Sequence, residues 1–320
     1  MKKILLVFVL LVSSCSSTAT KEMFAMDTII QITVNSYNSD AVVSSAEQIL
    51  FELDKELDKT DGLLKQINDN GGGVLSGYAG EAIKAAYEFS EKTNGSFDLT
   101  VAPLIDLWGF YTKNYHVPND GELKTALEHI GYKKISISDN QIELNDTKID
   151  IDGIAKGYAT DVIVENLKEN NVDSALLSLG GNVYAIGKKA HSPWKIGIAN
   201  PKSPSEYIGT VSVSDKAVVT SGTYQRNFTQ DNILYHHILD PSTGKNPEKN
   251  LASVTVIGES AAECDALSTA FFVMGINNSL DYLSGNQHLG AIFIDNEGEI
   301  YLTNNLENAF KSDKNYTVLN

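Results

Sequence analysis

The sequence predicts an α+β fold in which layered, mixed β-sheets pack against helices. Segments rich in β-branched residues alternate in polarity, as in DTIIQITVN at residues 27–35, which is typical of strands. Residues 40–59 and 261–275 carry apolar side chains with a spacing or density typical of helices. Strands and helices follow one another in mixed order, which favours a layered α+β fold over a regular βαβ array.

The remaining elements are expected in chain order between these segments. A glycine-rich loop at 71–80 leads into a second helix ending near Lys92, and residues 93–110 form a turn and an aromatic-rich loop. A helix is expected at 120–130, followed by strands at 133–138 and 141–144. Residues 148–170 are expected to form a strand, a tight turn at Gly153 and a helix, and residues 174–187 two strands around a double glycine. Further strands are expected at 194–199, 207–220, 231–239 and 251–258, and a closing hairpin at 290–303.

The N-terminus has the pattern of an export signal. Lys2 and Lys3 precede a short apolar run and small residues that end at Cys15, and the run is too short to span a bilayer. We expect a lipoprotein signal peptide over 1–15 that ends at the lipidated Cys15, a flexible tether over 16–22 and a folded domain over 23–320. The alternative is an ordinary cleaved signal. The expected location is outside the cytoplasm, lipid-anchored to a bacterial membrane.

Charge and cysteine content narrow the possible partners. The formal charge is −16, and removal of Lys2 and Lys3 with the signal makes the mature chain −18. This excess of acid makes nucleic acid an unsuitable partner, and an anionic substrate needs a local positive site or a metal ion. Arg226 is the only arginine. With Cys15 lipidated, Cys264 is the only other cysteine, so no intramolecular disulfide forms.

Two segments could hold phosphate or metal. DGIAKG (152–157) opens a helix, where backbone N–H groups and Lys156 can bind phosphate, although the pattern is neither a P-loop nor a dinucleotide fingerprint. Asp265 and Thr269 are four apart on a helix and so face the same way, which suits Mg²⁺. A plain glycine turn and a dipole-stabilised helix terminus remain open as alternatives.

HHILDPSTGK (236–245) combines two histidines with a turn. Histidine can take a proton from an attacking hydroxyl near neutral pH. Strand alternation sends His236 and His237 to opposite faces, so only one of them can point into a given site.

Seven segments in this order resemble the ApbE family from about residue 23 to the C-terminus: MDT, NGSFDLTVAPLIDLWGF, DIDGIAKGYATD, SLGGNVYAIG, TSGTYQRNF, HHILDPSTGK and CDALSTAFFVMG. The resemblance implies a T-fold-related fold with a flavin cleft between its halves. It further implies an exported, Mg²⁺-dependent FAD:protein FMN transferase. Such an enzyme splits FAD, attaches FMN to a threonine hydroxyl of a membrane-associated redox protein and releases AMP.

The resemblance also implies roles for individual residues. His237 matches the catalytic residue, whereas His236 lies outside the family pattern. Gly153, through its carbonyl, and Asp265 and Thr269 match the metal ligands. The FAD contacts are matched by Met26, Ser96, Phe97, Asp98, Asp150, Lys156 and Leu239.

Two alternative functions stay open. In a Mg²⁺-dependent FAD pyrophosphatase, water would replace the threonine hydroxyl. A non-catalytic flavin-binding lipoprotein would need no proton acceptor, so the presence of His237 with Asp265 and Thr269 argues against it. Self-flavinylation at Thr269 is disfavoured because that residue lies on an apolar helix.

Overall fold

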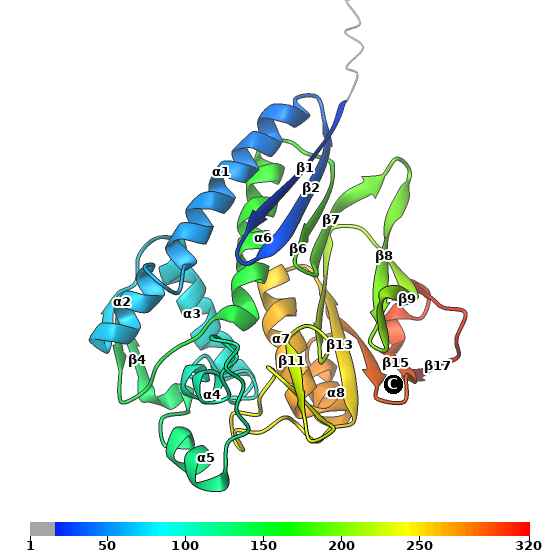
Figure 1. The fold of residues 1–320 in the computed structure, drawn as a ribbon. Helices are drawn as coiled ribbons and strands as arrows, with labels where there is room; N and C mark the ends of the chain where they lie inside the picture. The colour runs from blue at the N-terminus through cyan, green and yellow to red at the C-terminus, as the bar shows by residue number, and fades with distance from the viewer. Residues whose placement is uncertain (1–16) are drawn as a thin grey trace, which may run out of the picture.

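The computed structural model describes residues 17–320, and within this range one large sheet is covered by helices (Figure 1). Its α-helices are α1 (Ser39–Leu57), α2 (Leu63–Asn70), α3 (Gly77–Lys92), α4 (Ala102–Leu107), α5 (Asp120–Leu127), α6 (Asp152–Glu169), α7 (Ala261–Met274) and α8 (Ile276–Ser284). No helix in the described part of the chain has the length and apolar character required to cross a membrane.

The large sheet has twelve strands and is mostly antiparallel. Its main path runs β1 (Ser17–Ala25), β2 (Thr28–Ser36), β6 (Ser174–Leu179), β7 (Asn182–Lys189), β10 (Lys216–Gly222), β13 (Leu251–Gly258), β14 (Gly290–Asp295), β15 (Ile300–Thr303) and β17 (Tyr316–Leu319). Off this path lie β8 (Ser192–Asn200), β9 (Ser203–Val213) and β16 (Phe310–Lys311). The β15–β17 pair is parallel.

Two small sheets complete the described fold. One contains β3 (Gly72–Val74), β5 (Gln141–Leu144) and β4 (Ile135–Ser138). The other is the hairpin of β11 (Asn227–Gln230) and β12 (Ile233–His236), which has no further strand partner among residues 17–320. In Figure 1 the hairpin lies in front of the large sheet, close to α7.

The main core lies between the large sheet and helices α1, α3, α6 and α7. Ile32 and Leu177 from the sheet pack with Leu50 of α1, Ile163 of α6 and Leu267 of α7, and all five are fully buried. Helix α7 is buried almost all round, as expected for a helix that is apolar on every face. It therefore provides a fixed support for any polar side chain that it carries.

Two smaller cores flank the main one. On the opposite face of the sheet, Val218 and Ile292 pack with Ile196 and Val211 of the β8–β9 ribbon. A third cluster around Trp108 joins α4 and α5 to Leu239 and the β11–β12 hairpin. The hairpin is thus held by aromatic packing and not by the large sheet.

The described structure corrects the expected tether. Residues 17–22, predicted to be flexible, belong to β1, which pairs with β2 from Ser17↔Ser36 to Ala25↔Thr28. The polar sequence STATKE is compatible with both a solvent-exposed edge strand and a flexible tail. Only the pairing with β2 shows that the segment is a strand. Cys15 and the signal peptide lie outside the described residues.

Other elements differ from expectation in smaller ways. Residues 148–151 are irregular instead of a strand, and Gly153 lies in the first turn of α6 instead of in a tight turn before it. The expected strand 207–220 is divided between β9 and β10, and β11 was not expected. The predicted hairpin at the double glycine is confirmed, with Gly180 and Gly181 at positive φ between β6 and β7.

Candidate active site

A cleft of about 2270 Å³ opens where the β1–β2 turn, the end of α1 and the start of α6 meet. The loop after α4 and the segment before β11 complete its wall. Among the lining residues are Met26, Lys59, Tyr111, Lys156 and Arg226, which come from five different parts of the chain. The cleft therefore depends on the whole fold and not on one local motif.

The β1–β2 turn is conformationally unusual. Met26 and Asp27 both have positive φ, at 51° and 58°, as a two-residue type I′ turn requires. Neither is a glycine, so the turn carries a conformational cost of order 1 kcal/mol or more. The backbone N–H of Met26 donates to Oδ1 of Asp54 on α1, at 2.7 Å, and fixes Met26 at the edge of the cleft.

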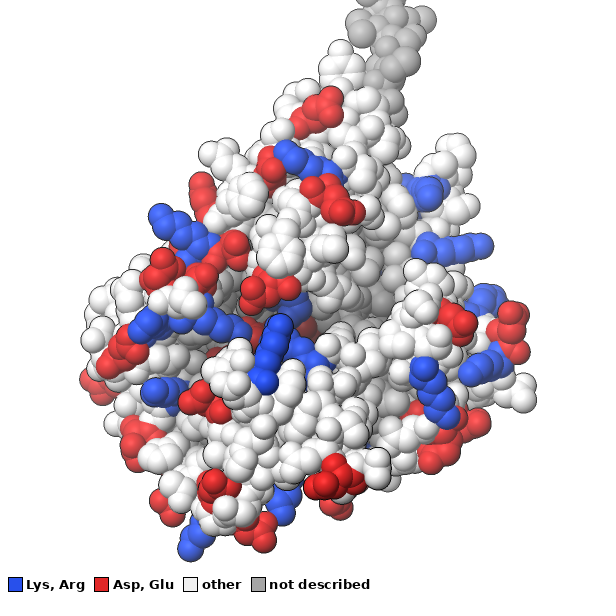
Figure 2. Space-filling model, viewed as in Figure 1, with Lys and Arg blue, Asp and Glu red and all other residues white. Residues whose placement is uncertain are grey.

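Opposite charges meet at the start of α6. Asp152 forms ion pairs with Lys59 and with Nη1 of Arg226, the latter at 3.1 Å. Asp150 lies 3.8 Å from Nζ of Lys59 and accepts a hydrogen bond from the Tyr111 hydroxyl. Figure 2 shows basic side chains beside acidic ones at a hollow near the middle of the face in view.

The pKa values of the two carboxyl groups move in opposite directions. Burial and the neighbouring charge of Asp152 raise the pKa of Asp150. Burial would also raise the pKa of Asp152, but the charges of Lys59 and Lys156 outweigh it and lower this pKa to about 2. Asp152 is therefore a permanent anion that holds Lys59 and Arg226 at the cleft.

Helices α6 and α7 meet closely beneath this cluster. The N–H of Gly157, which in a regular helix donates to the Gly153 carbonyl, donates to Oδ2 of Asp265 at 2.9 Å. A Cβ at Gly157 would lie 2.3 Å from the carbonyl oxygen of Ala261 and 2.7 Å from Cβ of Asp265. Only glycine permits this contact.

The same contact brings the expected metal ligands together. A Cβ built at Gly153 would lie 3.5 Å from Oγ1 of Thr269, so the first turn of α6 faces the hydroxyl of α7. Asp265 is 5% exposed, and burial raises its pKa while the charge of Lys156 opposes the rise. A buried carboxylate, a hydroxyl and a nearby backbone carbonyl are oxygen donors of the kind that Mg²⁺ prefers.

These residues fit Mg²⁺ by their chemistry. Within residues 17–320 no group of three His, Cys, Asp or Glu side chains could hold a metal ion. The expected set of Gly153, Asp265 and Thr269 contains only one such side chain, so its other ligands would be neutral oxygens. The ligand assignment stays a prediction.

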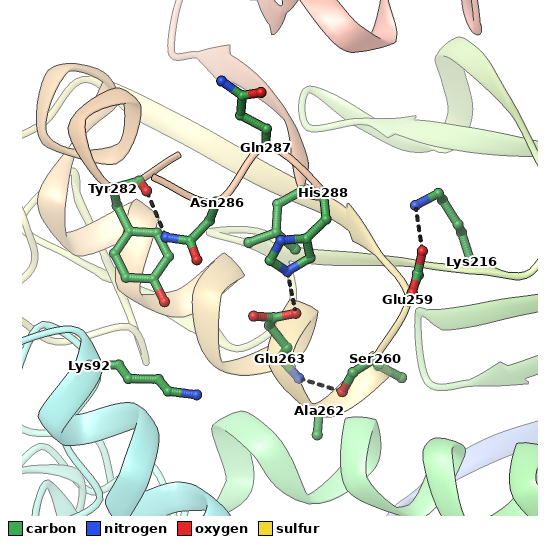
Figure 3. A network of polar contacts seen from close by, with 12 residues as sticks. Lys92, Lys216, Glu259, Ser260, Ala262, Glu263, Tyr282, Asn286, Gln287 and His288 are labelled. Atoms are coloured by element: carbon green, nitrogen blue, oxygen red, sulfur yellow. Dashed lines mark hydrogen bonds and ion pairs between the residues drawn. The ribbon is translucent and has the colours of Figure 1, made fainter. Parts of the chain in front are cut away.

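The N-terminus of α7 is fixed by contacts that do not involve the expected metal ligands. Ser260 is the N-cap, and its Oγ accepts the N–H of Glu263 at 3.2 Å, while Glu263 also pairs with His288 (Figure 3). The carboxylate of Asp161 on α6 accepts the N–H groups of Ala261 and Ala262, at 2.7 and 2.9 Å. This double capping positions α7, and with it Asp265, against α6.

His237 follows β12 and lies partly buried beside Arg226. Its Nδ1 is 3.2 Å from the backbone oxygen of Arg226, and its backbone N–H donates to the same oxygen at 3.1 Å. A carbonyl oxygen only accepts, so Nδ1 carries the proton and Nε2 is left as the free acceptor. Burial, followed by the charge of Arg226, lowers the pKa of His237 to about 3. The ring is therefore a neutral base at neutral pH.

His236 has a different environment, as strand alternation predicts. Its ring packs edge-on against Phe272 of α7 at 5.4 Å, whereas His237 packs against Phe110. The side chain of Asn246 binds both backbone groups of His236. His236 is a buried structural residue.

The structure places the other predicted FAD contacts in several environments. Met26, Asp150 and Lys156 line the cleft. Phe97 packs on Gly153, and Asp98 uses its carboxylate to hold Thr100 and the N–H of Tyr132. Ser96 lies in the turn after α3. Leu239 lies in the hydrophobic cluster around Trp108.

Three polar residues of the cleft were not among the predicted site residues: Lys59, Tyr111 and Asp152. Lys59 and Tyr111 lie in loops without a motif, and only tertiary contacts bring them to Asp150. Asp152 precedes the first glycine of DGIAKG and is the first residue of α6. That position at a helix start was the one sequence feature that could have identified Asp152 as a site residue.

Comparison with known proteins gives one consistent result. The model of the ApbE family matches residues 26–293. A curated FAD:protein FMN transferase of Treponema pallidum is 29% identical over 88% of this chain and 87% of its own length. A second curated FAD:protein FMN transferase, from Klebsiella pneumoniae, is 30% identical over 75% of this chain and 76% of its own length. The crystal structure of the ApbE protein of Thermotoga maritima covers 89% of this chain and 96% of its own, with 35% identity and a TM-score of 0.81.

Proposed function

The chain belongs to the ApbE family, and from this premise we propose that it is an FAD:protein FMN transferase that uses Mg²⁺ and a threonine hydroxyl as acceptor. The acceptor is an exported or membrane-associated redox protein. The observation that carries the proposal is the fixed tautomer of His237, whose free Nε2 is a proton acceptor beside the cleft residue Arg226.

In the proposed reaction His237 acts as the general base. The threonine oxygen attacks the FMN phosphorus of FAD, a new P–O bond forms, and the P–O bond to AMP breaks. The hydroxyl proton goes to Nε2 of His237, and AMP leaves. A positioned base of this kind contributes about 10²–10⁴-fold in rate.

The charges around the cleft support binding of a pyrophosphate. Lys59, Lys156 and Arg226 are balanced by three carboxylates, those of Asp150, Asp152 and Asp265. A pyrophosphate adds negative charge to this balanced site, so a further cation is required. Asp265, Thr269 and the Gly153 carbonyl would hold Mg²⁺, which would supply that charge neutralisation.

We further propose that the protein is exported and lipid-anchored through Cys15, with residues 1–15 as the signal peptide. The sequence before β1 supports this, because a basic start and an apolar run precede the cysteine. The anchor would keep the enzyme on the same membrane as its acceptor.

One incubation tests the transferase. The form from residue 16 onward is mixed with FAD, Mg²⁺ and the acceptor domain of an exported redox protein. Transfer is expected to add the mass of one FMN to the acceptor and to release AMP, and chelation of Mg²⁺ by EDTA should abolish both. AMP and free FMN without an adduct would identify a pyrophosphatase, and FAD binding without products would identify a flavin-binding protein.

A further inference from the structure

The β11–β12 hairpin ends in backbone groups that no described residue satisfies. One hydrogen bond shows which residue pairs of the hairpin are hydrogen-bonded. The N–H of His237 donates to the Arg226 carbonyl, so Arg226 and His237 form a hydrogen-bonded pair. In an antiparallel pair, hydrogen-bonded and non-hydrogen-bonded residue pairs alternate. The pairs Asn227↔His236 and Thr229↔Leu234 are therefore non-hydrogen-bonded, and their N–H and C=O groups point away from the hairpin.

The two outer edges differ. On β12 the side chain of Asn246 imitates a neighbouring strand: its Oδ1 accepts the N–H of His236 at 3.1 Å, and its Nδ2 donates to the His236 carbonyl. On β11 the outward backbone groups of Asn227 and Thr229 make no hydrogen bond within residues 17–320. The β11 edge is the more open of the two.

The open edge adjoins the active site. Asn227 lines the cleft, as do Gln225 and Arg226 immediately before it. The carbonyl of Arg226 also orients the ring of His237. A strand added to β11 would lie about 4.8 Å from β11 and about twice that from the continuation of β12 that carries His237, a gap that side chains from the two strands can bridge.

The hairpin also lacks the features that usually protect a free sheet edge. The outer strand of the large sheet, β1, carries the charged residues Lys21 and Glu22, whereas β11 and β12 contain no Lys, Glu or Pro. At the tip of the hairpin, Ile233 and Leu234 are 53% and 48% exposed. An exported protein that leaves such an edge open exposes it to pairing with another chain.

The hairpin is nevertheless held in place. Phe228 stacks on Tyr115 with ring centroids 4.6 Å apart and planes 11° apart, and it stacks on Tyr235 at 5.3 Å. Trp108 packs on Tyr235 at 5.4 Å. The edge is therefore preorganised, so a partner strand would not have to order it.

We propose that the acceptor protein docks by adding an extended segment to the free edge of β11, which brings its threonine to His237. This inference rests on the proposed transferase function. Backbone hydrogen bonds to Asn227 and Thr229 would provide the affinity, independently of most of the acceptor's side chains.

Two proline variants test the edge. In Thr229→Pro the lost N–H is the outward one, so the ladder between β11 and β12 remains. Leu234→Pro is the matched control, because it alters the other member of the same pair on the opposite edge. We expect Thr229→Pro to raise KM for the acceptor by about tenfold, the effect of losing one or two hydrogen bonds, with FAD affinity unchanged. Leu234→Pro should change KM less than about twofold on the same grounds. An equal rise in both variants would overturn the proposal.

Hydrogen exchange provides a second test that does not depend on the fold of a proline variant. The protein with His237→Ala, saturated with FAD and Mg²⁺, is compared with and without the acceptor domain, so that transfer is slowed by about 10²–10⁴-fold during the measurement. The amides of Asn227 and Thr229 should become protected, while that of Leu234 should not. If the wild-type protein forms the FMN adduct but these two amides exchange equally fast with acceptor, the docking proposal fails alone. If no adduct forms, the proposed function fails.

Discussion

At the scale of single residues, two adjacent histidines acquire different roles from their surroundings. His236 packs against Phe272 of α7 and is held by Asn246, while His237 faces Phe110 and is oriented by the Arg226 carbonyl. Burial is the main cause that lowers both pKa values, to about 4 for His236 and about 3 for His237. Both rings are neutral at neutral pH, but only His237 has a free nitrogen beside the cleft.

Replacement of His237 should therefore separate chemistry from binding. His237→Ala is expected to bind FAD with little change and to lose about 10²–10⁴-fold in transfer rate. Single-turnover transfer and fluorescence titration with FAD measure the two effects. His236→Gln is the matched control and should keep most of the transfer rate. Unchanged transfer in His237→Ala would remove this residue from the mechanism.

The same lowered pKa values predict a pH dependence of stability. Unfolded histidine has a pKa near 6.5, so between pH 6.5 and about 4 the unfolded chain binds protons that folded His236 does not. The contribution of His236 to the free energy of unfolding should thus be fully present above pH 6.5 and should be lost as the pH falls toward about 4. Urea unfolding at several pH values measures it. In His236→Gln the slope should be smaller by up to roughly 1.4 kcal/mol per pH unit. Identical slopes would contradict the assignment.

At the scale of elements, the contact between α6 and α7 positions Asp265, a proposed metal ligand, against α6. Gly157→Ala would place a methyl group 2.3 Å from the Ala261 carbonyl and remove the space that Asp265 occupies. We expect a loss of about 1–3 kcal/mol in stability, typical of overpacking, and a higher Mg²⁺ requirement for transfer. Thermal unfolding and Mg²⁺ titration of activity measure these effects.

The matched control for that change is Gly285→Ala at the end of α8. There φ is −87° and the nearest atom to a new Cβ is 3.8 Å away, so stability should be nearly unchanged. Equal stability of the two variants would show that the α6–α7 contact can relax.

The elements also show where sequence reasoning succeeds. Helix α7 and the β6–β7 hairpin were predicted from local signals, a strongly apolar segment and a double glycine, and both are confirmed. Short helices such as α2 and α8 were missed because eight or nine residues give little periodic signal. Strand β1 was mistaken for a tether because a solvent-exposed edge strand is as polar as a tail.

The candidate site was only partly predictable for a related reason. Asp265 and Thr269 share a helix face, so their spacing alone brings them together. Lys59 lies 93 residues from Asp152, and Arg226 lies 74 residues from it in the other direction. No local sequence pattern predicts contacts between residues so far apart in the chain. These contacts form only when α1, α6 and the hairpin meet around the cleft.

At the scale of the whole molecule, the proposed anchor predicts where the protein is found. The wild-type protein should sediment with membranes, and Cys15→Ser should release it or leave it with an uncleaved signal. Cys264→Ser is the matched control, because Cys264 is buried in α7, and it should remain in the membrane fraction. Fractionation and mass measurement detect both outcomes. If Cys15→Ser behaved like the wild type, the lipid anchor would be ruled out.

The strand that replaces the expected tether also sets a distance. Only Ser16 separates Cys15 from β1, and β1 runs for nine residues to the turn at the cleft edge. At about 3.3 Å per residue, the strand spans roughly 30 Å between its first residue and the turn at the cleft edge. The proposed lipid anchor at Cys15 would therefore hold the cleft at roughly this distance from its attachment point. An acceptor on the same membrane would then have to raise its threonine to that height, so the proposed anchor would select partners by reach before any side chain is recognised.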